Sequence, residues 1–94
     1  MKIKYTTSDQ QTTTVLKFKR VTQYKTESTF TIHTQCVVKV NSLIQGVGTV
    51  VKYYGDIDNP KWAYFSSVKK ALKDTNITKE VKSVLWKQLI QKMK

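Results

Sequence analysis

His33 and Cys36 are the single histidine and the single cysteine of the chain, and these residue types can form a nucleophilic pair. Such a pair needs a hydrogen bond between the thiol and the imidazole. The two residues lie three positions apart in a strand-like segment, where an odd separation sends side chains to opposite faces. We therefore expect a buried cysteine and a surface histidine, and no catalytic residues. The chain also lacks the four Cys or His ligands of a structural zinc site.

Asp56 and Asp58 are the closest pair of carboxylates in the sequence. Two such groups could hold Mg²⁺ in a nuclease or phosphoryl-transfer site, which is one interpretation of the pair. The surrounding segment, Gly55-Asp56-Ile57-Asp58-Asn59-Pro60, has the composition of a turn, and no third acid lies nearby. We favour the turn, and we expect no metal, no cofactor and no enzymatic activity.

Gly46-Val47-Gly48 is the most glycine-rich segment, but it is too short for a phosphate-binding loop. It lacks the later glycine and the helix N-terminus that such loops use. Together with Asn41-Ser42, it predicts a loop or bulge between two strands.

Lysine dominates the charged residues. The 94 residues include 17 basic and 6 acidic ones, which gives a formal net charge of +11, and Arg20 is the single arginine. An excess of this size indicates a polyanionic partner: a phosphate backbone, an anionic membrane surface or an acidic protein surface. The alternative is a lysine-rich surface that only keeps the protein in solution. Because lysine acts as a point charge and arginine is the usual reader of guanine, we expect salt-sensitive binding with weak sequence specificity.

Basic and aromatic residues share the same segments. Aromatic side chains on a sheet can stack on unpaired bases, whereas a lysine-rich helix can lie along a duplex backbone. Both single- and double-stranded DNA or RNA therefore stay open as ligands. The candidate nucleic-acid-binding residues are Lys17, Lys19, Arg20, Lys52, Tyr53, Lys69, Lys70, Lys73 and Lys87.

The first part of the chain, residues ~2–54, predicts an antiparallel sheet of three to five strands. Alternating polar and apolar residues over 12–25 and 29–40 predict a hairpin that turns at Thr26-Glu27-Ser28. Residues 49–54 predict a third interior strand. Residues 2–7 predict an edge strand whose lysines oppose aggregation.

The last part of the chain predicts two helices, over residues ~60–74 and ~78–93, packed on one face of the sheet. Asn59 can cap the first helix and Pro60 suits its first turn. The alternative is a short strand over 62–65 followed by a helix from Ser66 or Ser67. The whole chain, 1–94, is expected to be one α+β domain.

The second predicted helix is apolar around most of its circumference. Either it is clasped between the sheet and the first helix, or one flank meets a second subunit in a homodimer. The residues of that flank are Trp86, Ile90 and Met93.

These patterns predict a small, non-enzymatic, nucleic-acid-binding protein. The alternative is an accessory or inhibitor protein of a phage or mobile element that docks on an acidic protein surface. Residues 1–5 contain no apolar signal region, and no apolar run is long enough to span a bilayer. We therefore expect no membrane partner and a cytoplasmic location, in the host cell if the protein is viral.

Overall fold

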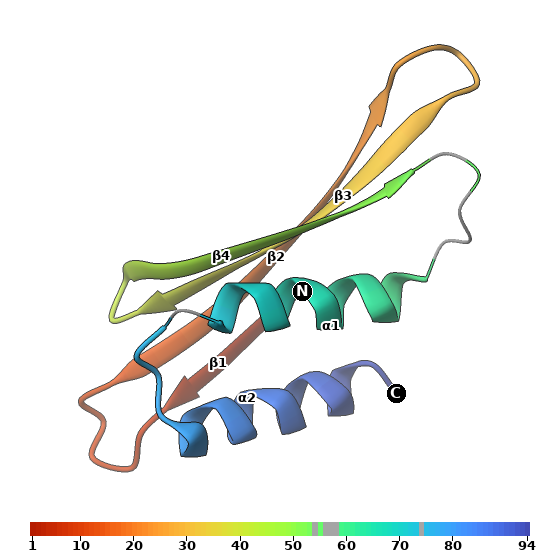
Figure 1. Ribbon diagram of the computed structural model, residues 1–94. Helices are drawn as coiled ribbons and strands as arrows, with labels where there is room; N and C mark the ends of the chain where they lie inside the picture. Colours follow the sequence, from red (N-terminus) through yellow and green to blue (C-terminus); the bar gives the residue numbers. More distant parts are fainter. Residues whose placement is uncertain (54, 56–58, 74) are drawn as a thin grey trace.

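The computed structural model describes residues 1–53, 55, 59–73 and 75–94. It has the predicted α+β arrangement, a four-stranded antiparallel sheet followed by two helices (Figure 1). The elements are β1 (Lys2–Thr6), β2 (Thr13–Tyr24), β3 (Phe30–Val40), β4 (Leu43–Tyr53), α1 (Pro60–Leu72) and α2 (Lys79–Lys92). Each strand pairs with the next one in the sequence, and both helices lie on the same side of the sheet. Among the described residues, no helix covers the opposite face of the sheet.

The long hairpin of β2 and β3 is confirmed, with a continuous register from Thr14 opposite Val40 to Tyr24 opposite Phe30. Its turn lies where the sequence predicts it and is closed by a 2.9 Å hydrogen bond from the Lys25 N–H to the Thr29 carbonyl. Figure 1 shows this end of the hairpin projecting beyond both helices. The hairpin gives the molecule its elongated shape, which measures 52 × 27 × 19 Å.

The connection between β3 and β4 differs from the expected loop. Asn41 and Ser42 form a two-residue turn with φ values of 49° and 72°, as a type I′ hairpin turn requires. The Asn41 side chain supports it by accepting a 2.9 Å hydrogen bond from the Thr13 N–H. Strand β4 therefore begins at Leu43 and not at Thr49, and it forms an edge of the sheet where an interior strand was predicted. A register shift between Val38 and Lys39 does provide a bulge.

Gly46 and Gly48 lie inside β4, where they allow α1 to approach the strand. A Cβ atom on Gly48 would lie 2.1 Å from the Ser67 carbonyl oxygen, and one on Gly46 would lie 2.0 Å from the Ala71 oxygen. Residues two apart on a strand share a face, so both glycines face the helix. Of the predicted loop or bulge, the bulge is found beside Gly46, where the register with β3 shifts. The loop was wrong, because the glycines lie within β4 and provide close packing between a strand and a helix.

The first helix confirms the longer of the two predicted versions, and the alternative strand over 62–65 is wrong. Asn59 caps α1 by accepting a 3.0 Å hydrogen bond from the Trp62 N–H, and Pro60 takes the first position. In α2, the Thr78 hydroxyl accepts a 3.4 Å hydrogen bond from the Val81 N–H. Neither of the helices in the described residues has the length and apolarity needed to cross a membrane.

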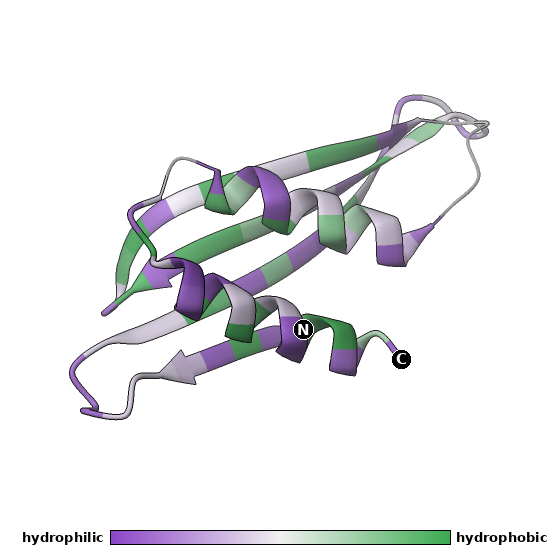
Figure 2. Cartoon of the chain, turned by 60° about the horizontal axis from the view of Figure 1, so that its bottom comes forward, coloured by the Kyte–Doolittle hydropathy of each residue, from purple (hydrophilic) through white to green (hydrophobic). Residues whose placement is uncertain are grey.

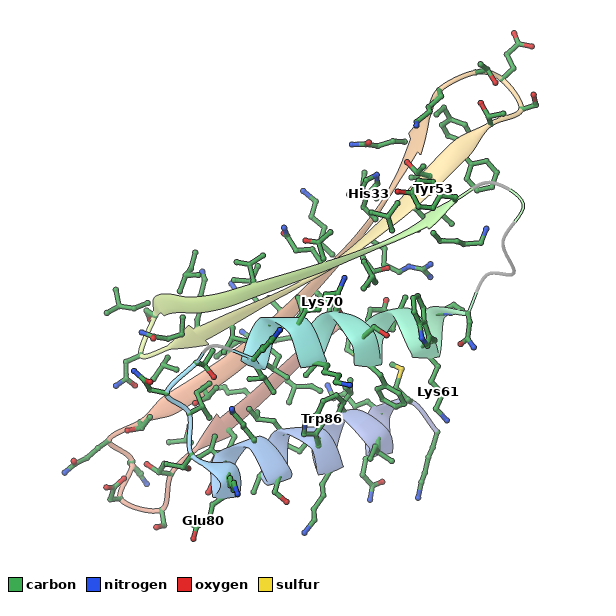
Figure 3. The ribbon with its side chains drawn as sticks, viewed as in Figure 1. His33, Tyr53, Lys61, Lys70, Glu80 and Trp86 are labelled. Atoms are coloured by element: carbon green, nitrogen blue, oxygen red, sulfur yellow. The ribbon has the colours of Figure 1, made fainter. Side chains whose placement is uncertain are left out.

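The hydrophobic core joins one face of the sheet to both helices. Its buried members are Ile3, Leu16, Cys36, Val38, Val68, Ala71, Leu72, Leu85 and Leu89. Figure 2 shows the hydrophilic and hydrophobic alternation along β1 that sends one set of its side chains into this core. Trp86 and Met93 also pack against it, and the Trp86 ring lies 6.0 Å from the Phe65 ring between α2 and α1 (Figure 3).

These contacts cover most of the apolar side chains of α2 without a second subunit. Of the flank predicted to meet a second subunit, Ile90 is 46 % exposed, while Trp86 and Met93 are partly buried against the core. The homodimer stays a prediction, with Ile90 as its most exposed contact.

Replacing Gly48 with alanine tests the close contact of α1 with β4. In an open strand, Gly→Ala would stabilise by about 0.4–1 kcal/mol through the unfolded state. Here the added methyl group meets helix backbone, so we expect a destabilisation of about 1–3 kcal/mol or more. Urea unfolding measures it, with the exposed neighbour Val47→Ala as a control that stays within about 1 kcal/mol of wild type. A Gly48→Ala variant as stable as wild type would contradict the contact.

Candidate nucleic-acid interface

The helix-free face of the sheet carries a cluster of lysines. Even-numbered residues of β2 and β3 face the helix side of the sheet, where Leu16 and Cys36 lie in the core. Odd-numbered residues of these strands, and even-numbered residues of β1, therefore point away from the helices. The side chains brought together there, which we call the lysine face, are Lys2, Lys4, Lys17, Lys19 and Lys39.

The strand register places these lysines in neighbouring rows. Lys2 pairs with Lys17, while Val15 pairs with Lys4 on one side and with Lys39 on the other. Strands lie ~4.8 Å apart and residues on one face repeat every ~6.7 Å, so the five lysines cover an area of about 10 × 14 Å. A depression lined by Lys17, Lys19, Lys39 and Ile44, among others, lies over the β2, β3 and β4 side of this area.

No acidic residue lies within any of the four strands. Like charges directly opposite each other on a sheet are destabilising, as in the pair of Lys2 and Lys17. The acidic residues nearest in sequence, Asp9 and Glu27, lie in the loops at the two ends of β2. The lysine face therefore concentrates positive charge, and an external anion would reduce the repulsion between its lysines.

Arg20, Lys52 and Tyr53 lie outside the lysine face. The Arg20 Nε donates a 3.2 Å hydrogen bond to the Thr34 hydroxyl, and its guanidinium lies 6.0 Å from the centre of the Tyr64 ring, on the helix side. The Lys52 ammonium lies 5.2 Å from the centre of the Phe30 ring. Tyr53 is 59 % exposed at the far end of β4, near His33 (Figure 3).

The predicted lysines of α1 form a second site. Lys69, Lys70 and Lys73 line a groove together with Val50, Trp62 and Ser66, which we call the Trp62 groove. Lys70 reaches over the edge of β4 and donates a 3.2 Å hydrogen bond to the Thr49 carbonyl. Lys87 is exposed on α2 and belongs to neither site. The predicted binding residues are thus divided among several surfaces.

Each helix also has one lysine that donates a hydrogen bond to a backbone carbonyl of an outer strand. Lys70 does so on β4, and Lys92 donates a 2.9 Å hydrogen bond to the Lys2 carbonyl on β1. Edge strands with unpaired backbone groups are sites of aggregation, and lysines reduce that tendency. Some of the positive charge is therefore used to protect the edges of the sheet.

The residues that the prediction left out are Lys2, Lys4 and Lys39 on the lysine face, and Trp62 in the groove. Alternation along β1 and β3 could have placed the three lysines on the polar face of their strands. Their meeting with Lys17 depends on the register of three strands, which a single sequence does not specify. Trp62 received no functional role from the sequence, and it is 55 % exposed in the structure.

His33 and Cys36 lie on opposite faces of β3, as their spacing predicts. Cys36 is buried in the core, and the His33 Nε2 lies 3.0 Å from the Thr31 hydroxyl. Asp56 and Asp58, the pair weighed as a metal site, lie outside the described residues. Within the residues that the structure does describe, there is no cluster of three or more side chains that could hold a metal ion.

Comparison with known proteins adds no family to these observations. The chain matches no protein-family model, and searches of curated proteins and of solved structures found no match. Its function is therefore proposed below from its own residues and their arrangement.

The buried thiol gives a pH-dependent prediction. Burial raises the pKa of Cys36 from 9.0 to about 12. Between these values the unfolded chain loses the thiol proton while the folded chain keeps it, so stability must fall as the pH rises through this window. Unfolding free energies at pH 8 and pH 11 should show a larger loss for wild type than for Cys36→Ala. Equal losses for the two proteins would show that the thiol is accessible.

Proposed function

We propose that this protein binds nucleic acid without catalysing a reaction, and that the lysine face contacts the phosphate backbone. The observation that carries this proposal is the arrangement of five lysines on a helix-free sheet face whose strands contain no acidic residue. Such a face attracts an extended anion at long range and releases the counterions of that anion on contact.

A nucleic acid suits the dimensions of the lysine face. Double-stranded DNA carries one negative charge per ~1.7 Å of helix axis, and a single strand also carries one phosphate per nucleotide. A face of about 10 × 14 Å can therefore meet several phosphates at once. Lysines contact phosphates without reading bases, so the proposed binding is weakly sequence-specific and weakens with salt.

Removing charge from the lysine face tests the proposal. We expect Lys17→Gln combined with Lys19→Gln to weaken oligonucleotide binding at ~50 mM salt. The variant should also flatten the plot of log K against log salt concentration. The slope changes by ~0.7 per lost phosphate contact for single strands and ~0.9 for duplexes, so two contacts correspond to about 1.4–1.8. Fluorescence anisotropy of a labelled oligonucleotide measures both quantities.

The matched control is Lys25→Gln combined with Lys94→Gln. It removes the same charge from the hairpin turn and the C-terminus, which lie outside both sites. The control should keep most of the wild-type affinity and slope. Equal losses in the two variants would mean that net charge, and not the lysine face, produces the binding. Wild-type protein that binds neither single- nor double-stranded oligonucleotides at this salt concentration would refute the proposal.

An acidic protein partner is the second candidate. Leu43, Ile44 and Val47 are 68 %, 62 % and 50 % exposed on β4, and two of these side chains share a face with the lysines. Exposed apolar residues beside a charged area are typical of protein interfaces. This candidate predicts a defined complex from nuclease-treated lysate that Ile44→Ser combined with Val47→Ser disrupts. Loss of every partner on nuclease treatment would exclude it.

A further inference from the structure

We infer that the ligand is a single strand, which passes from the lysine face around the edge of β4 into the Trp62 groove and stacks an unpaired base on Trp62. This inference rests on the proposed function, and it adds the strandedness of the ligand and a second contact site. Three features carry it: the composition of the groove, its position behind the lysine face, and the exposure of the Trp62 ring.

The Trp62 groove combines an apolar floor with a positive rim. Val50, 6 % exposed, contributes to the floor, and Lys69, Lys70 and Lys73 supply three ammonium groups. Trp62, Ser66, Lys69 and Lys73 follow one another on one flank of α1, at spacings of three and four residues. From Trp62 to Lys73 this stripe is about 16 Å long, and α1 contains no acidic residue. An aromatic ring and a row of cations are the two parts of a site for an unpaired nucleotide.

Trp62 is available for such a contact, whereas the other tryptophan is not. Trp86 packs against Phe65 and the core. Trp62 is 55 % exposed, although its backbone N–H is fixed by the Asn59 cap. The ring is therefore held at the start of a capped helix with much of its surface open to solvent. Aromatic rings in this position stack on bases of any sequence, in keeping with the low specificity expected of lysine contacts.

The two sites lie on opposite sides of the sheet, the lysine face on β1 to β3 and the Trp62 groove beside β4. Val47 of β4 faces the helix-free side, where it pairs with Val37, and Val50 faces α1. Lys70 stands between the two sides, with its ammonium group on the carbonyl of Thr49 at the edge (Figure 3). Lys19 is level with Gln35 of β3 and Thr49 of β4, so the ligand crosses two strand spacings, about 10 Å, before it turns around the edge.

Duplex and single strand differ in whether they can follow this path. Double-stranded DNA has a persistence length of about 50 nm, so a duplex on the lysine face cannot bend around one strand into the groove. A single strand is flexible and presents unpaired bases, so it can contact both sites. An acidic peptide would also meet the lysines, but the exposed indole ring beside them favours a base.

The intrinsic fluorescence of Trp62 tests the inference. In a Trp86→Phe variant, Trp62 is the only tryptophan. We expect a twelve-residue oligothymidine to quench its emission, with the quenching reversed by salt, and a duplex of matched length to bind without comparable quenching. If Trp86→Phe does not fold, the same comparison uses wild type against Trp62→Phe, in which the quenchable signal disappears.

Affinity measurements complete the test. Trp62→Ala should weaken binding of the oligothymidine about tenfold and leave duplex binding unchanged, and Trp62→Phe should restore part of the loss. Lys17→Gln combined with Lys19→Gln should weaken both ligands. Single-strand binding without quenching, or unchanged in Trp62→Ala, would overturn this inference and leave the proposed function standing.

Two further outcomes would also overturn the inference. Quenching by a duplex as strong as by oligothymidine would show that the groove does not depend on unpaired bases. Quenching by polyglutamate at equal charge concentration would assign the groove to an acidic peptide. If neither oligonucleotide binds to the wild-type protein, the proposed function fails together with the inference.

Discussion

The close contact between α1 and β4 is the constraint on which the rest of the structure depends. Gly46 and Gly48 offer no side chain there, so the helix backbone lies directly on the strand. That position brings Val68 and Ala71 of α1 into the core. It also leaves the outer flank of α1, with Trp62 and its lysines, beside the edge of β4. A larger residue at either glycine would lift the helix and disturb both the core and the groove.

Because both helices occupy one face, the two faces of the sheet differ in character. The covered face supplies the core, and the bare face is free to concentrate lysines that would be costly in an interior. Charge therefore follows the architecture. Arg20 and Lys52 lie over aromatic rings, Lys70 and Lys92 protect sheet edges, and Lys2 and Lys4 lie on the edge strand β1. For Lys17, Lys19 and Lys39 of the lysine face, we infer no such structural role. A surface that concentrates like charge without internal compensation is the reason for proposing a partner of opposite charge.

Much of the fold could be predicted because local signals and tertiary packing agree. The alternation in the hairpin and the Asn59-Pro60 helix start each specify their element directly, and both are found. The Gly46-Val47-Gly48 segment correctly indicated a bulge but not a loop. Glycine occurs both in loops and in close packing, and only the helix that follows later in the chain decides between them. The early start of β4 was therefore not predicted, because the turn before it consists of only two residues, Asn41 and Ser42.

The candidate site could be predicted only in part. Net charge and the lysines of single segments were visible in the sequence, but the meeting of Lys2, Lys17 and Lys39 depends on the register of three strands. The exposure of Trp62 likewise depends on which flank of α1 the sheet covers. Charge composition therefore led to the proposal of a polyanionic partner, whereas tertiary structure divided the basic residues into a face, a groove and separate structural contacts.

Mapping of amide chemical shifts tests the central claim most directly. Titration of ¹⁵N-labelled protein with an oligonucleotide should shift the resonances of the lysine face on β1, β2 and β3. The outer surface of α2 around Lys87 should stay unchanged. These shifts should reverse when salt is added, because the contact is made with phosphates. Shifts confined to α2, or no shifts at a concentration of oligonucleotide that saturates binding in solution, would contradict the account.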